Sequence, residues 1–226
     1  MGAVIPLSDA TRRPRRFPFV TVFIIVVNVL VFMRELMGGE AFVLQWAAVP
    51  VDLVAGHRWI TLLTAMFMHG SWSHIVGNMV FFWAFGPEIE GAMNPLRYLA
   101  FYLVGGLISM LAQVASSPGS AVPSLGASGA IAAVMGAFLV IYPRDQIRSL
   151  LFILVFVRVT FIPAALLIGV WFLIQLFSVG TVADVQTGGV AYMAHIGGFI
   201  FGVVTARIFV DPQCVADQGR QEDEEF

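Results

Sequence analysis

The stretch "PSLGASGAIAAVMG" at residues 123–136 places a serine, Ser128, among small residues at the start of an apolar run. Ser128, Ala132 and Gly136 recur every four residues, so on a helix they form one stripe of minimal side chains. Such stripes let two membrane helices approach closely. The stretch therefore predicts a tightly packed helix, and it raises the question of whether Ser128 is an incidental hydroxyl or a nucleophile.

The composition is that of a polytopic helical membrane protein. Of the 226 residues, 59% are hydrophobic and only 12% are charged, and the mean hydropathy is +0.88. Soluble domains carry roughly 25% charged residues, so an unusually apolar soluble protein is disfavoured. The net charge of -2 does not suggest nucleic acid as a partner, and the single cysteine excludes an internal disulfide.

Six apolar stretches are long enough for spanning helices, which need about 20 residues. They are Phe17–Met33, Ser73–Phe85 with an extension at its start by "TLLTAMFMHG" (61–70), Tyr98–Val114, Gly126–Tyr142, Phe161–Val179 and Gly189–Phe209. We therefore expect an all-α membrane protein with a six-helix domain over residues 17–210. A polar N-terminal segment, 1–16, would precede it, and a flexible acidic tail, 211–226, would follow it.

Arginine placement predicts the orientation of these spans. With the N-terminus in the cytoplasm, the inside segments hold ten arginines and the outside segments hold two, Arg34 and Arg58. This positive-inside bias places both termini in the cytoplasm. The first apolar run is long and lacks a small-residue cleavage site, so it is interpreted as an uncleaved span. We expect a multi-pass integral protein of a bacterial inner membrane.

Two segments between the spans have other predicted roles. Residues 147–157 are apolar but too short to cross a membrane. They are interpreted as a strand or partial helix at the cytoplasmic interface, and a seventh span is the alternative. Residues 37–60 are expected to form a long outside loop that lies partly in the membrane interface through Trp46 and Trp59.

Polar side chains inside apolar spans are costly and usually serve a purpose. In and around these spans they are Asn28, His69, His74, Asn78, Gln113, Ser128, Gln175 and His195. His195 shares a helix face with Gly198 and Gly202, a second small stripe. If this face meets the stripe of Ser128, serine and histidine lie at one level, in the outer half of the membrane.

This combination favours nucleophilic catalysis. His195 could remove the proton of Ser128, and an oxyanion could be held by the side chains of His74 and Asn78 and by the backbone N–H of Ser128. No aspartate or glutamate lies deep in a span, so a Ser–His dyad is expected rather than a triad. The alternatives are helix packing alone, interhelical hydrogen bonding by the histidines, and metal or haem ligation by them.

Three ordered motifs resemble the rhomboid intramembrane serine proteases, across residues 17–210. They are "HGSWSHIVGNM" (69–79), with the pattern H-x4-H-x3-N, the nucleophile motif "GASG" (126–129), and "AHIGGFIFG" (194–202). The segment "FGPEIEG" (85–91) also looks like the loop that follows the second span in that family.

The resemblance implies a role for each matching residue. Ser128 would be the nucleophile, His195 the general base, and Asn78 and His74 the oxyanion stabilisers. Structural residues near the site would be His69, Glu90, Gly126, Gly198 and Gly202. The implied substrates are single transmembrane helices cut near the outer membrane surface, gated by the fifth span and a cap loop near 180–190. No metal or cofactor is implied.

The chain departs from the family pattern at two places. Some members carry a tyrosine that packs on the catalytic histidine where this chain has Ala132, and the outer loop reads "HRW" at 57–59 instead of Trp-Arg. Two other functions stay open. A catalytically silent relative would bind membrane helices, and its Ser128 would not be labelled by a fluorophosphonate. A transporter or channel would show flux that is independent of Ser128.

Overall fold

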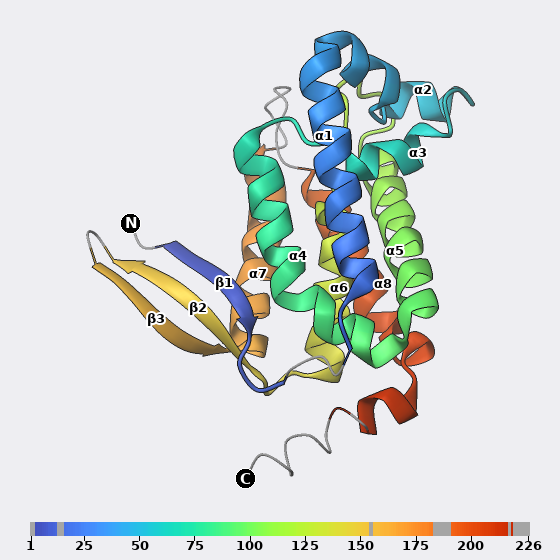
Figure 1. The fold of residues 1–226 in the computed structure, drawn as a ribbon. Helices are drawn as coiled ribbons and strands as arrows, with labels where there is room; N and C mark the ends of the chain where they lie inside the picture. Colours follow the sequence, from blue (N-terminus) through green and yellow to red (C-terminus); the bar gives the residue numbers. More distant parts are fainter. Residues whose placement is uncertain (1–2, 13–15, 154–155, 183–190, 217, 219–226) are drawn as a thin grey trace.

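The computed structural model describes residues 3–12, 16–153, 156–182, 191–216 and 218 of the 226-residue chain. Long helices lie side by side, and a small sheet projects from one side of the bundle (Figure 1). The long helices are α1 (Phe19–Trp46), α4 (Trp72–Met93), α5 (Pro95–Ser116), α6 (Ser128–Ile141), α7 (Ala164–Val182) and α8 (Tyr192–Phe209). The short elements are α2 (Pro50–Val54), α3 (Thr61–Thr64), the 3-10 turn η1 (Ala65–Phe67) and the strands β1 (Ala3–Asp9), β2 (Gln146–Ile153) and β3 (Phe156–Pro163).

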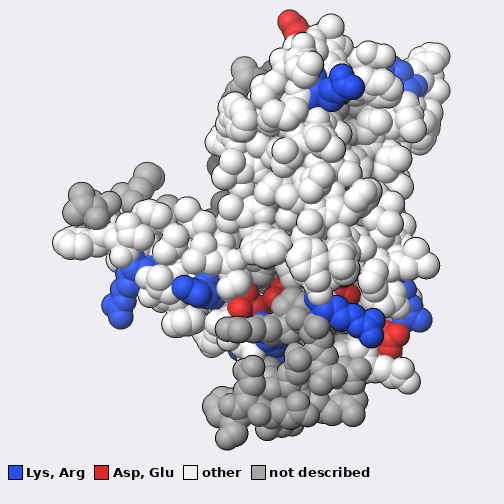
Figure 2. Space-filling model, viewed as in Figure 1, with Lys and Arg blue, Asp and Glu red and all other residues white. Residues whose placement is uncertain are grey.

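The apolar character of the chain is concentrated in these helices. By length and composition α1, α5 and α8 can each cross a membrane, and residues 128–141 and 164–178 form shorter apolar helices. Figure 2 shows, on the face it displays, charged side chains near both ends of the bundle and an uncharged band between them. The molecule is therefore an integral membrane protein with a mostly helical fold.

The expectation of an all-α fold is wrong in one respect, because the chain also builds a three-stranded antiparallel sheet in the order β1-β2-β3. Ile5 pairs with Leu150, which in turn pairs with Val159. The strand interpretation of residues 147–157 is thus confirmed for the described residues, and the seventh span is wrong. Strand β1, at one edge of this sheet, comes from the polar N-terminal segment. Because β3 continues to Pro163, the fifth long helix begins at Ala164 and not at Phe161.

The segment at 37–60 is less of a loop than expected. Helix α1 continues to Trp46, with an interruption at Gly39, whose φ is +59°. Arg58 then fastens the segment to itself, because its guanidinium donates to the carbonyl oxygens of Leu44 and Gln45 and lies 3.0 Å from Asp52 Oδ2. These bonds satisfy carbonyl groups at the end of α1 that have no partner within the helix.

Small residues allow α6 and α8 to pack at backbone contact. On α8 the contact uses the predicted Gly198 and Gly202, and on α6 it uses Gly129, Ala133 and Gly136, so only Gly136 of the predicted stripe takes part. A Cβ atom at Gly202 would collide with the carbonyl oxygen of Ala133, and one at Gly136 would collide with the carbonyl oxygen of Phe199. Ala132 and Ala133 of α6 are completely buried. Since neither helix can rotate without losing this fit, the contact fixes which residues of α6 and α8 face each other.

The C-terminal tail begins against the end of the bundle. The backbone N–H of Asp211 donates to the carbonyl oxygen of Ala92, at 2.9 Å, and residues 212–216 form a helical turn. The remaining tail, residue 217 and residues 219–226, lies outside the described residues, and so does most of the expected cap loop, at 183–190.

Candidate active site

Ser128 and His195 meet although they are far apart in the sequence. Ser128 is the first residue of α6 and His195 lies in the first turn of α8. The Oγ atom of Ser128 is 2.7 Å from Nε2 of His195. The histidine is only 8% exposed, so this hydrogen bond is shielded. A serine paired in this way with a buried imidazole is arranged for activation as a nucleophile.

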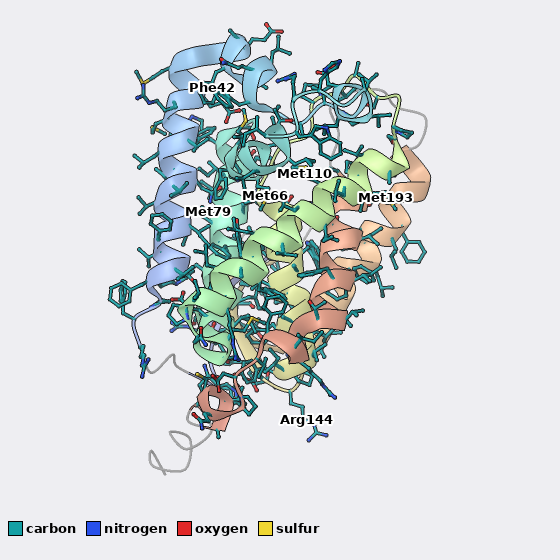
Figure 3. The ribbon with its side chains drawn as sticks, turned by 90° about the vertical axis from the view of Figure 1, so that its right-hand side faces the viewer. Phe42, Met66, Met79, Met110, Arg144 and Met193 are labelled. Carbon is teal, nitrogen blue, oxygen red and sulfur yellow. The ribbon has the colours of Figure 1, made fainter. Side chains whose placement is uncertain are left out.

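The backbone contact between α6 and α8 continues to the level of this pair. A Cβ atom at Gly198, one turn after His195, would collide with the carbonyl oxygen of Gly129, which directly follows Ser128. The backbones of the two helices are therefore in close contact beside the serine and the histidine as well as at Gly202. Met193, two residues before His195, lies nearer the Phe42 end of the bundle than the Arg144 end (Figure 3).

Gly126 brings His74 to the same place. Its φ of +133° is in the region that favours glycine, and its N–H donates to the carbonyl oxygen of Ala65, at 2.9 Å. A Cβ atom here would lie 3.0 Å from the Nε2 atom of His74 and 3.5 Å from the Oγ atom of Ser128. The turn before α6 thus leaves room for the His74 ring next to the serine.

Asn78 follows His74 by one turn of α4, as the sequence spacing predicts. The side chain is buried, with 8% of its surface exposed. Its Nδ2 atom has no hydrogen-bond partner among the described residues. A buried amide donor without an acceptor is costly, so such a group is a candidate for binding an atom that arrives only with a substrate.

His69 packs against His74 and is fully buried. The two ring centroids are 5.0 Å apart in an edge-to-face arrangement. The hydrogen bond at this residue comes from its backbone N–H, which donates to Oε2 of Glu35 at 2.9 Å. Within the described residues its ring nitrogens have no partner, so its visible role is to support the His74 ring.

Glu90 does not lie near the serine. The segment 85–91, expected as a loop, is part of α4, which continues past Pro87 to Met93. Glu90 is 16 residues beyond His74, roughly 24 Å along the helix axis. Its carboxylate accepts hydrogen bonds from the N–H of Val20 and from the N–H and hydroxyl of Thr21, at 2.8–2.9 Å. It therefore fastens the start of α1 to α4.

Gln175 is part of the site, and the sequence assigned it no role beyond being polar in an apolar stretch. Its Oε1 atom lies 2.8 Å from Nδ1 of His195, on the opposite side of the ring from Ser128. Its Nε2 atom donates to the carbonyl oxygen of Trp171, at 3.3 Å. Spacing alone could not show this contact, because it depends on how α7 is rotated against α8.

The rings of Trp171 and Tyr192 flank His195. The Trp171 ring centroid is 5.7 Å from that of His195, and the Tyr192 centroid is 6.5 Å from it. In this chain Trp171 and Tyr192 therefore supply the aromatic packing on His195, since Ala132, at the position where some rhomboid proteases carry a tyrosine, offers only a methyl group. Among the described residues no group of three or more His, Cys, Asp or Glu side chains could hold a metal ion.

Comparison with known proteins gives consistent matches. The family model for the Rhomboid domain matches residues 56–212. Rhomboid protease GluP of Bacillus subtilis is 32% identical over 124 residues, which are 54% of this chain and 24% of that protein. Rhomboid protein 1, mitochondrial, of Saccharomyces cerevisiae is 27% identical over 185 residues, 79% of this chain and 49% of that protein.

A third relative matches along most of this chain. Rhomboid protease GlpG of Salmonella choleraesuis is 29% identical over 215 residues, 90% of this chain and 71% of that protein. The chain spans about a quarter of the length of the Bacillus relative and about half of that of the yeast relative. The family model covers well over half of the 226 residues and includes the serine, the histidines and Asn78. The chain belongs to the rhomboid family.

Proposed function

We propose that this chain is an intramembrane serine endopeptidase that cleaves transmembrane-helix substrates near the outer membrane face with a Ser–His dyad. The observation that carries the proposal is the distance of 2.7 Å between Oγ of Ser128 and Nε2 of His195. Two of the relatives, GluP and GlpG, bear the name rhomboid protease, which supports peptide-bond hydrolysis as the reaction.

In the proposed reaction Nε2 of His195 takes the proton of the Ser128 hydroxyl while Oγ bonds to the scissile carbonyl carbon. The carbonyl π electrons move to its oxygen, which becomes the oxyanion. The imidazolium then gives its proton to the leaving amine as the C–N bond breaks. Water then attacks the acyl carbon while Nε2 of His195 takes its proton. The C–Oγ bond breaks and the imidazolium returns this proton to Oγ, which releases the carboxylic acid and the free serine.

Three donors are proposed to hold the oxyanion. The backbone N–H of Ser128 is at the first position of α6, where no intrahelical acceptor exists. The Nδ2 group of Asn78 is buried without a partner in the described part of the chain. His74 lies beside Gly126 and Ser128. Donors that are already in place when charge develops cost no reorganisation during the reaction.

The membrane topology is also part of the proposal. The six long helices would each span the bilayer, with both termini in the cytoplasm, as the placement of ten inside arginines against two supports. The membrane would be a bacterial inner membrane, and the site would lie in its outer half. The substrates would be single-pass transmembrane proteins whose helices unwind locally before cleavage, which weak helix formers such as glycine would ease.

Cleavage of a model single-pass substrate by the purified chain in liposomes tests the proposed function. We expect Ser128→Ala and His195→Ala each to abolish cleavage and labelling by a fluorophosphonate. Ser149→Ala is the matched control, because Ser149 is a fully buried serine of β2 whose hydroxyl donates to Ile147. Cleavage that persists in Ser128→Ala would overturn the proposal.

A further inference from the structure

The side chain of Gln175 has two hydrogen bonds that together determine how its amide is oriented. The carbonyl oxygen of Trp171 can only accept, so the Gln175 atom 3.3 Å from it must be the NH2 nitrogen. The oxygen Oε1 therefore faces Nδ1 of His195, at 2.8 Å. A glutamine oxygen can only accept.

This orientation determines the tautomer of the histidine. Because Oε1 can only accept, Nδ1 of His195 must carry the hydrogen of the neutral ring. Nε2 then has its lone pair free, and it faces the hydroxyl of Ser128 at 2.7 Å. That is the one tautomer in which the neutral imidazole can take a proton from the serine.

We propose that Gln175 is a positioning residue that holds His195 in the tautomer and ring orientation needed to deprotonate Ser128. The inference rests on the Ser–His dyad proposed above and assigns to it a third group, which is an uncharged amide from α7. Gln175 is 7% exposed, so water does not readily replace it as the acceptor.

An amide suits this position better than a carboxylate for a physical reason. An ionised carboxylate inside a membrane protein costs several kcal/mol, whereas an amide supplies an acceptor oxygen without a charge. Trp171 also helps to orient His195, because it lies one turn before Gln175 on α7 and packs against the imidazole ring. One face of α7 thus supplies both the hydrogen bond and the aromatic contact that orient His195.

The test compares three variants of Gln175 in liposomes with the model substrate. Gln175→Leu keeps the approximate volume but removes the acceptor. We expect kcat to fall roughly 100-fold with KM changed less than twofold. The imidazole of His195 would no longer be held in the required tautomer and orientation, whereas the contacts with the substrate would be unchanged. Gln175→Glu keeps an acceptor oxygen in either protonation state and should retain most of kcat. Gln175→Asn withdraws the oxygen by one methylene and should resemble Gln175→Leu.

Asn28→Leu is the matched control, because Asn28 is a buried amide on α1 that also donates to the carbonyl four residues earlier, at 2.7 Å. It should retain kcat. If Gln175→Leu does not fold, the comparison of Gln175→Glu with Gln175→Asn tests the inference, and we expect a much higher kcat for Gln175→Glu. Wild-type kcat in Gln175→Leu, equal losses in the leucine and glutamate variants, or a change confined to KM would each overturn the inference. Activity that survives Ser128→Ala would instead overturn the dyad itself.

Discussion

The carbonyl oxygen of Gly129 lies so close to Gly198 that a Cβ atom on Gly198 would collide with it. Gly129 is the neighbour of Ser128, and Gly198 is one turn beyond His195. The contact between two backbones therefore sets the distance between the hydroxyl and the imidazole. Packing and the proposed catalysis are joined at this point, since a wider helix spacing would leave the serine without its base.

Gly198→Ala should lower both stability and activity. The added methyl group must push α8 away from α6, and overpacking of this kind costs about 1–3 kcal/mol. We expect a lower thermal midpoint in detergent and a loss of cleavage that exceeds the loss of folded protein. Gly169→Ala is the control, because a Cβ atom at this position of α7 has no neighbour within 4 Å. Equal activity in the two variants would contradict the close-approach argument.

Asn78→Ala should reduce kcat without destabilising the protein. Loss of one oxyanion donor costs about 100-fold in kcat. The resting protein loses no hydrogen bond from Nδ2, since that atom has no partner among the described residues. Cleavage rates and thermal unfolding of the same preparations check both parts. Asn28→Ala, a buried amide on α1, should keep its kcat, and an unchanged kcat in Asn78→Ala would remove Asn78 from the oxyanion site.

The helices and the small-residue faces could be predicted from the sequence because they rest on local information. Apolar runs of the right length and four-residue spacing of small residues are both visible in the chain itself. The same spacing placed Ser128, Ala132 and Gly136 on one face. Of these, Gly136 packs against Phe199 of α8, whereas Gly198 and Gly202 meet the neighbouring residues Gly129 and Ala133.

The features that the sequence did not yield depend on distant or rotational relationships. Strand β1 pairs with β2 across more than 130 residues, and nothing in the polar N-terminal segment indicates that partner. The continuation of α1 beyond Gly39 is supported by the bonds of Arg58 to carbonyl groups near Trp46. The role of Gln175 needed the rotation of α7 about its axis, which a uniformly apolar helix does not reveal.

Glu90→Gln should destabilise the fold while leaving the chemistry of the site intact. The carboxylate accepts three hydrogen bonds from Val20 and Thr21, and glutamine would turn an NH2 group toward these donors. Hydrogen bonds to charged groups contribute about 1.5–3 kcal/mol each, so we expect a loss of about 2–3 kcal/mol in the free energy of unfolding. Thermal unfolding in detergent checks this.

The control for Glu90→Gln is Glu40→Gln, a change of an exposed glutamate on the same bundle. Its thermal midpoint should equal that of the unaltered protein. At temperatures where Glu90→Gln is folded, its kcat per folded molecule should be unchanged, because Glu90 lies far along α4 from His74. A selective loss of kcat would show that Glu90 acts on the reaction after all.

The sheet should hold the N-terminal strand more weakly as the pH rises from about 4 to about 7. Burial, aided by the nearby Asp145, raises the pKa of Asp9 from 3.8 to about 7. The folded protein then binds more protons than the unfolded chain between these values. By linkage the stabilisation is fully present below pH 4 and is lost as the pH rises through 7. Hydrogen exchange of the β1 amides at pH 5 and pH 8, corrected for intrinsic rates, measures the effect.

Asp9→Asn removes this titrating group and should make the protection of β1 depend less on pH over this range. Asp145 is a poorer choice for the test, because it forms an ion pair with Arg12 at 2.6 Å and its loss would change two interactions at once. The neutral amide can still accept from the N–H of Thr11, which donates to Asp9 Oδ1 at 2.7 Å. Protection that rises with pH in the unaltered protein would contradict the direction, because it would require the pKa of Asp9 to be lower in the folded protein than in the unfolded chain.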